Sequence, residues 1–248
     1  MERFNKRNNT LPIEAAYGES LHHHPPHTEE NRNRQSPHLA KENELTAQST
    51  KTAAGVASVW KKLMVEAVTS SITGLSQMCN QHIKVASLKA KMIPIGQTAD
   101  LLGGADAFVA GVNLKMFGPG DGLMVVVLTL RTAFDLIDVV MDEPNGTTQD
   151  FGELELSVLG EIGNVMGAHF LNTISDEVNL ELQVSPPKVT IATVGKIVDE
   201  AQSILNVKSE DMLVLDTAFG TPVREIHGKF LAMPSPELLN ALIERLRV

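Results

Sequence analysis

The sequence lacks several features that would assign it quickly to a class of protein. Its single cysteine, Cys79, excludes an internal disulfide, and the position of Cys79 on a predicted apolar helical stripe favours a buried structural thiol over a reactive one. No run approaches the ~18–20 apolar residues that a membrane span requires. The first nine residues, MERFNKRNN, lack the apolar segment of a secretory signal. We therefore expect a cytoplasmic protein without membrane insertion.

Positive charge is also scarce. The chain has 21 Lys and Arg against 30 Asp and Glu, a formal net charge of −9. This balance argues against nucleic acid or an anionic membrane as the main partner, because both need clustered Lys and Arg. Hydrophobic residues make up 43% of the 248 residues, which is enough for a sizeable core. The acidity by itself identifies no partner.

The N-terminal part of the chain lacks apolar periodicity. Residues 1–54 are rich in Asn, Glu, His, Ser, Thr and Pro, which predicts a disordered polar tail before a folded domain over residues 55–248. The tract HHHPPH at 22–27 offers metal ligands, but nothing nearby would fix their geometry. Adventitious binding is favoured there over a functional metal site.

Apolar spacing predicts the order of the folded elements. Helices are expected over residues 56–81, 132–141, 151–174 and 236–247. Strands are expected over residues 82–95, 107–117, 123–130, 178–184, 189–194, 212–219 and 225–233. Hairpin-like turns such as Gly118–Gly122 join many of these strands, so the predicted sheet is largely antiparallel.

The same pattern occurs twice along the chain. Glu66 matches Glu161 at an offset of 95 residues, and Gly122 with its following apolar run matches Gly228 at an offset of 106. Each half therefore runs helix, strands, helix. The predicted fold is α/β of the α+β type, in which halves 55–146 and 147–248 share one sheet flanked by helices under pseudo-twofold symmetry.

The helix expected over 151–174 carries a polar set on one face. At 3.6 residues per turn, Ser157, Glu161 and Asn164 lie within about 60° of one another. The apolar stripe on the other side consists of Leu156, Leu159, Ile162, Met166, Phe170 and Ile174. Asp150 and Glu153 predict a capping box at the start of this helix. Such polar sets are usually just solvated, so spacing alone assigns no function.

Three glycines interrupt this helix at positions 160, 163 and 167. Each costs roughly 0.8–1 kcal/mol relative to Ala. All three lie beside the apolar stripe, where a missing Cβ would let another helix or the sheet approach closely. The equivalent positions of the first half hold Val65, Val68 and Ile72.

The spacing of Ser157, Glu161 and Asn164, with Pro186 or Pro187 downstream, resembles a known signature. This signature belongs to the CheC/CheX/FliY family of chemotaxis phosphatases: Asp or Ser, three residues, Glu, two residues, Asn, then about 21 or 22 residues and Pro. The text EIGN at 161–164 and the ending GKFLAMPSPELLNAL are also similar. The resemblance extends over roughly residues 58–248 and is nearest to the CheC branch. CheX-like relatives carry the signature only in their second half, which keeps that branch open.

The resemblance implies a role for each residue of the signature. The activity would be hydrolysis of the aspartyl phosphate on a CheY-type receiver in chemotaxis and flagellar motility. Asn164 would orient the attacking water, and Glu161 would pair with a receiver lysine. Ser157 would assist docking, and Pro187 or Pro186 would shape the adjacent loop. Mg²⁺ would come with the receiver, so this chain itself would need no metal ligands.

The first half departs from the signature. Lys62 stands where Asp or Ser is expected, Glu66 is retained, Thr69 replaces Asn, and Pro94 lies too far along the chain. We therefore expect one working site, in the second half. The degenerate first half also motivates the alternative of a non-catalytic adaptor, which would bind the deamidase CheD or act as a scaffold in the flagellar switch.

Overall fold

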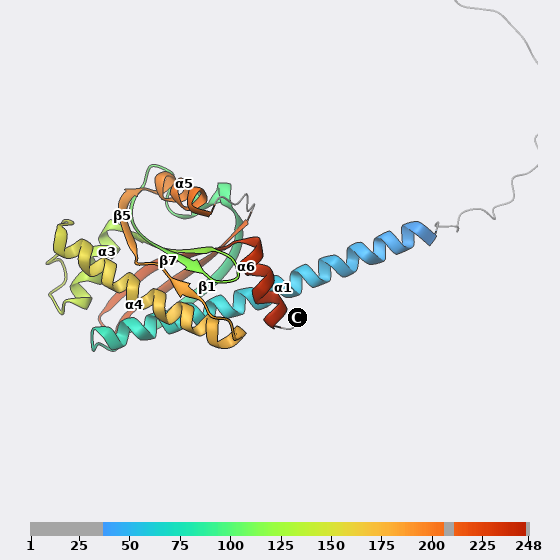
Figure 1. Ribbon diagram of the computed structural model, residues 1–248. Helices are drawn as coiled ribbons and strands as arrows, with labels where there is room; N and C mark the ends of the chain where they lie inside the picture. The colour runs from blue at the N-terminus through green and yellow to red at the C-terminus, as the bar shows by residue number, and fades with distance from the viewer. Residues whose placement is uncertain (1–36, 206–210, 247–248) are drawn as a thin grey trace, which may run out of the picture. The chain divides into compact units, whose positions relative to one another are not determined.

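The computed structural model describes residues 37–205 and 211–246, and it separates into compact units over 1–46 and 47–248. Figure 1 labels several of the helices and strands. The helical elements of the described residues are α1 (Pro37–Met78), which begins in the first unit, the 3₁₀ turn η1 (Ile95–Gln97), α2 (Thr98–Leu101), α3 (Leu130–Val140), α4 (Glu153–Val178), α5 (Val194–Leu205) and α6 (Pro236–Leu246). The strands are β1 (Lys84–Pro94), β2 (Phe108–Phe117), β3 (Gly122–Thr129), β4 (Gln183–Val184), β5 (Lys188–Thr193), β6 (Asp211–Thr221) and β7 (Arg224–Pro234).

The seven strands form one sheet that confirms the predicted symmetry. The strand order is β1-β6-β7-β3-β2-β4, with β5 also paired to β2, and all the pairs are antiparallel. The central pair is β3 with β7, one strand from each half. Val125 lies opposite Leu231 in this pair, and Leu231 is the residue that Val125 matches at the offset of 106. The pseudo-twofold axis therefore passes through the middle of the sheet.

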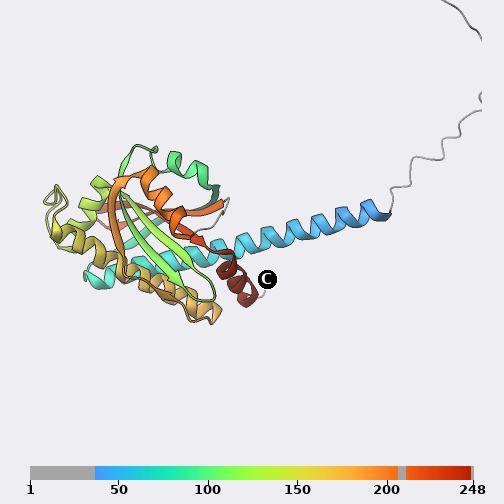
Figure 2. The same ribbon diagram turned by 45° about the horizontal axis from the view of Figure 1, so that its top comes forward.

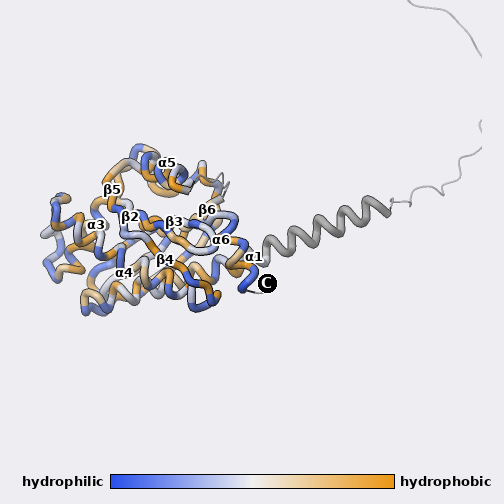
Figure 3. The backbone as a smooth tube through the Cα atoms, viewed as in Figure 1, coloured by the Kyte–Doolittle hydropathy of each residue, from blue (hydrophilic) through white to orange (hydrophobic). Residues whose placement is uncertain are grey.

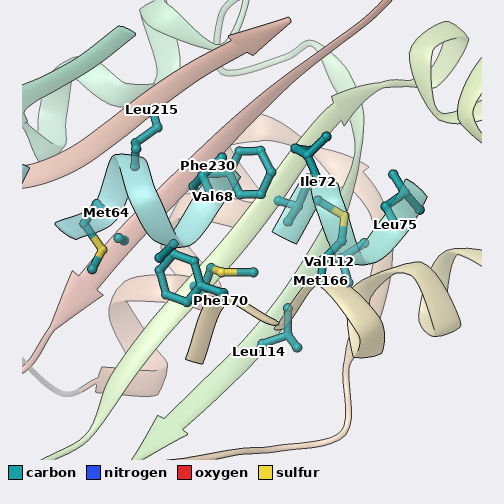
Figure 4. Close-up of a cluster of buried hydrophobic side chains, with 14 of the residues drawn as sticks. Met64, Val68, Ile72, Leu75, Val112, Leu114, Met166, Phe170, Leu215 and Phe230 are labelled. Carbon is teal, nitrogen blue, oxygen red and sulfur yellow. The ribbon is translucent and has the colours of Figure 1, made fainter. Parts of the chain in front are cut away.

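Helices cover both faces of the sheet (Figure 2). One apolar cluster joins α1, α3, α4 and α6 to one face, and a second joins η1, α2 and α5 to the other. Figure 4 shows the first cluster, which includes Met64 and Ile72 of α1, Phe170 of α4 and Phe230 of β7. Burying side chains of this size contributes roughly 1.5–3 kcal/mol each. Helix α4 packs on the sheet through its apolar side, so its polar side faces outward.

Helices α1 and α4 run in opposite directions side by side (Figures 1 and 2). The Ser71 hydroxyl of α1 donates a hydrogen bond to the Met166 carbonyl of α4 at 2.9 Å. A Cβ added at Gly74 would lie 2.2 Å from the His169 ring. Both contacts join residues 95 positions apart, which are equivalent in the two halves. The same pseudo-twofold axis therefore passes between the two helices.

The link between the two halves is held by the buried carboxylate of Asp138 in α3. Its two oxygens accept hydrogen bonds from the N–H of Gly146 at 2.8 Å and of Thr148 at 2.9 Å. Phe134 then packs on Phe151, with ring centroids 4.5 Å apart, just before α4 begins. Burial alone would raise the pKa of Asp138, but the bonds from Thr148 and Gly146 and the charge of Arg224 hold it below its usual value.

We expect Asp138→Asn to lower the free energy of unfolding by about 2 kcal/mol at pH 7, because an amide replaces a buried, hydrogen-bonded carboxylate. The folded-state pKa lies below the unfolded one. The ionised carboxylate therefore stabilises the fold above the unfolded pKa and loses this effect as pH falls through the folded pKa. Urea unfolding of both proteins at pH 7 and near pH 3 tests this. An equal loss of stability on acidification in the two proteins would show that Asp138 is not responsible.

Two helix starts differ from the sequence-based prediction. Helix α1 begins at Pro37 and not near Val56, since Ala, Lys, Glu, Leu and Gln in that segment favour a helix even without an apolar stripe. Helix α4 begins at Glu153 after Gly152, whose N–H donates to Glu155 at 2.9 Å, so the predicted cap at Asp150 was wrong. The tract at 22–27 lies outside the described residues, and the division at 54/55 stays a prediction.

The prediction of a strand over 178–184 was also wrong, except at its last two residues. Helix α4 continues to Val178 and ends at Asn179, which adopts the left-handed conformation that Asn tolerates better than most residues. Only Gln183–Val184 then pairs with β2. The alternating Leu180 and Leu182 are partly buried against the first cluster from an irregular segment. Helices α2 and α5 were not predicted.

Candidate functional site on helix α4

The predicted polar residues lie together on the outer surface of α4. Ser157, Glu161 and Asn164 are all exposed. Leu159, Ile162, Met166, Phe170 and Ile174 are buried on the other side, as predicted, whereas Leu156 is 37% exposed and does not belong to the core stripe. Along α4 the tube in Figure 3 accordingly alternates between hydrophobic and hydrophilic colours.

Two of the three glycines let the sheet approach α4 closely. A Cβ at Gly163 would lie 2.4 Å from Cγ1 of Val112, and one at Gly167 would lie 2.4 Å from Cδ2 of Leu114. Both distances are too short for any real contact, so close approach to β2 confirms the predicted reason for these glycines. Gly160 is different: the nearest atom to an added Cβ is a Val189 methyl at 3.9 Å, an ordinary contact.

The two prolines differ in their relation to the helix. Pro187 is half-buried, and its Cβ would lie 3.2 Å from a Cβ at Gly163, next to Asn164 in the sequence. Pro186 is exposed. The loop that holds them is tied to β2, because the Ser185 N–H donates to the Lys115 carbonyl at 2.9 Å and the Lys115 N–H donates to the Ser185 hydroxyl at 3.1 Å. Pro187 is therefore the proline that packs behind the Asn164 turn.

The corresponding residues of α1 are occupied by contacts within their own helix. Lys62 lies 3.7 Å from Glu66, an exposed ion pair one turn apart. The Thr69 hydroxyl donates to the Val65 carbonyl at 2.8 Å. Glu161, in contrast, forms no ion pair with any residue in the described ranges, since Ser157 stands at the position of Lys62.

The two polar sets are separate. Both Glu66 and Glu161 lie five residues before the contact between Ser71 and Met166, on helices that run in opposite directions. At 1.5 Å per residue they are roughly 15–20 Å apart along the helix pair. Each set therefore lies on its own part of the surface.

One exposed residue of this surface was missed in the sequence. Leu154 is 56% exposed and lies one turn before Ser157. Its position in the sequence could have shown this, because Leu154 lies three residues before Ser157 and seven before Glu161, a spacing that places it on the same helix face. A single exposed Leu is ordinary, so it adds apolar area to the surface without defining a site.

No group of three or more His, Cys, Asp or Glu suited to hold a metal ion occurs among the residues that the structure describes. Within the same residues, no helix is long and apolar enough to cross a membrane. The half-buried Cys79 donates its thiol hydrogen to the Leu75 carbonyl at 3.0 Å. The outer surface of α4 presents a carboxylate, a carboxamide and a hydroxyl, from Glu161, Asn164 and Ser157.

Comparison with known proteins gives the same family resemblance as the predicted signature residues. The CheC-like family model matches residues 154–191, which run from α4 through the two prolines into β5. The CheY-P phosphatase CheC of Bacillus subtilis (strain 168) is 29% identical over 150 residues, covering 60% of this chain and 72% of that protein. Residues 154–191 of this chain are therefore similar to the CheC-like family, and the longer match is to one of its named phosphatases.

Two solved structures of flagellar proteins share the fold of this chain. FliY of Thermotoga maritima superposes with a TM-score of 0.60 at 19% identity, covering 78% of this chain and 96% of FliY. A chain of the FliG–FliM complex from H. pylori superposes with a TM-score of 0.55 at 10% identity, covering 75% of this chain and 98% of its own length. At these identities the likeness concerns the fold alone.

Proposed function

We propose that this chain hydrolyses the aspartyl phosphate of a CheY-type receiver in chemotaxis signalling, with the outer surface of α4 as its catalytic surface. The observation that carries the proposal is the exposed pair of Glu161 and Asn164, three residues apart on a helix fixed against the sheet. The named relative in Bacillus subtilis is a CheY-P phosphatase, which supports the same activity.

Hydrolysis of an acyl phosphate requires the protein mainly to position the attacking water. An acyl phosphate is already activated, so a water placed in line with the phosphorus supplies most of what hydrolysis needs. The neutral carboxamide of Asn164 both donates and accepts hydrogen bonds, and it can orient a water without adding negative charge near the phosphoryl group. Close packing of Gly163 on Val112 and Pro187 fixes the helical turn from which Asn164 extends.

Glu161 takes part in docking. A carboxylate beside a phosphoryl group is repelled unless it meets a cation, and a lysine of the receiver is a suitable partner. Because no described residue of this chain pairs with Glu161, its carboxylate is available for that lysine. Ser157, one turn earlier, adds a hydroxyl to the contact. The Mg²⁺ of the reaction is supplied by the receiver.

The loss of phosphate from a phosphorylated receiver, followed with and without this chain, tests the proposal. We expect the chain to accelerate the loss. Loss of phosphate no faster than from the receiver alone would refute the proposal.

A second candidate function, a non-catalytic adaptor, is favoured by the contacts of α1. With Glu66 paired to Lys62 and no Asn at position 69, this half has a surface suited to binding without hydrolysis. CheD and the flagellar switch are the partners of this proposal. Titration of CheD and of the receiver discriminates between the functions, since stable binding without turnover favours the adaptor.

The double substitution Lys62→Ser with Thr69→Asn should convert α1 into a second docking site. An exposed pair one turn apart is worth only about 0.3–0.5 kcal/mol, so Glu66 is easily released, and removal of Lys62 also removes a charge that repels the receiver lysine. Calorimetric titration with a receiver loaded with beryllofluoride, a stable mimic of the phosphoryl group, measures the stoichiometry. We expect one receiver per wild-type chain and two per variant. An unchanged stoichiometry would refute the role given to Glu66.

A further inference from the structure

Gly160 has no structural reason to be a glycine within this chain. Glycine weakens a helix interior relative to alanine. At Gly163 and Gly167 that loss is offset by contact with the sheet, but an added Cβ at Gly160 would meet only a Val189 methyl at 3.9 Å. The residue is half-exposed in the middle of α4. The fold therefore has room for a side chain that the sequence does not supply.

The vacant position lies beside Asn164. Residues four apart are neighbours on a helix surface, and helical side chains lean toward the N-terminus of their helix. The carboxamide of Asn164 is therefore expected to lean over the turn that contains Gly160 and Glu161. A side chain at position 160 would stand against that carboxamide, where an oriented water and the phosphoryl group have to fit.

The first half provides an internal comparison. The residue equivalent to Gly160 is Val65, which is half-buried on α1, and the residue equivalent to Asn164 is Thr69. The half without the Asn thus also has a branched side chain where the open helix surface would be. The second half has both the open helix surface at Gly160 and the carboxamide of Asn164, and the first half has neither.

We propose that Gly160 is a positioning residue of the proposed phosphatase, because the helix surface left bare by its missing side chain admits the phosphoryl group and the attacking water to Asn164. The inference rests on the proposed function and adds to it a requirement that the family signature of Ser, Glu, Asn and Pro does not contain. Gly160 touches no reacting atom through a side chain. It acts by leaving space.

Gly160→Val tests this inference against its structural alternative. We expect kcat for a phosphorylated receiver to fall about tenfold to a hundredfold, since a misplacement of about 1 Å can have that effect, while KM changes less than about threefold because Glu161 still docks. The midpoint of urea unfolding should stay unchanged or rise. Gly160→Ala should also lower kcat, but by a smaller factor. Asn172→Val, on the same face two turns beyond Asn164, is the matched control for a β-branched side chain on the exposed surface of α4.

A gain of function gives an independent readout. In the chain with Asn164→Ala, Lys62→Ser and Thr69→Asn, a further Val65→Gly should raise the rate of dephosphorylation above that of the parent. Full kcat in Gly160→Val, or a lowered urea midpoint that accounts for its lost activity, would overturn the inference while the wild type still showed the proposed function. A wild type with no activity would overturn both.

Discussion

Asn164→Ala is expected to slow dephosphorylation of the receiver about a hundredfold, as the loss of one well-placed catalytic hydrogen-bonding group does in other enzymes. The side chain is exposed and forms none of the hydrogen bonds observed within the described residues. Alanine is also a better helix former than asparagine. The free energy of unfolding should therefore stay the same or rise slightly, which separates lost catalysis from lost structure.

The matched control for this change is Asn172→Ala, which removes the same carboxamide from the same exposed face two turns further along α4. We expect it to retain the wild-type rate. Single-turnover decay of the phosphorylated receiver, with each chain in excess, measures the chemical step directly. Equal rates for Asn164→Ala and the wild type would remove the residue from the mechanism.

Gly163→Val should lower the free energy of unfolding by about 3 kcal/mol, at the upper end of overpacking costs. The Cβ alone would lie 2.4 Å from Val112 on β2 and 3.2 Å from Pro187, so α4 must move away from the sheet or both neighbours must shift. Since Pro187 packs behind the turn that bears Asn164, dephosphorylation should be slowed as well.

The comparison that isolates this effect is Gly160→Val, the same substitution on the same helix three residues earlier. Valine is a slightly better helix former than glycine, and the site has room for it, so its effect on stability should stay within about 0.5 kcal/mol. Chemical unfolding in urea at pH 7 measures both variants. If the two substitutions were equally destabilising, the close contact between α4 and β2 would not be the reason for Gly163.

The core and the symmetry could be predicted from the sequence because both depend on periodic patterns. Buried Ile162, Met166 and Phe170 recur at helical spacing, and the offset of 106 reappears as the pairing of Val125 with Leu231. Symmetry between halves limits the sheet to few arrangements, since equivalent strands must occupy equivalent places. The family resemblance then selected α4 and its polar face as the candidate site.

Other features depended on contacts that periodicity does not encode. Leu180 and Leu182 alternate like a strand, yet Asn179 ends the helix and the following residues pack without pairing. Asp138 lies between core residues of α3, and its apolar neighbours did not indicate that the backbone N–H groups of Gly146 and Thr148, in the turn after the helix, would satisfy its carboxylate.

The three glycines of α4 look alike in the sequence, and only the positions of Val112, Leu114 and Val189 distinguish Gly160 from the other two. Spacing placed all three beside the apolar stripe. The distances to the sheet divide them into two that are required by packing and one that is not.

The most direct test of the proposed activity is the number of phosphates released per chain when one chain is mixed with about ten phosphorylated receivers. We expect many turnovers per wild-type chain and release by Asn164→Ala close to that of the receiver alone. Release that stops at one phosphate per chain, or that is the same for both proteins, would contradict a catalytic surface on α4.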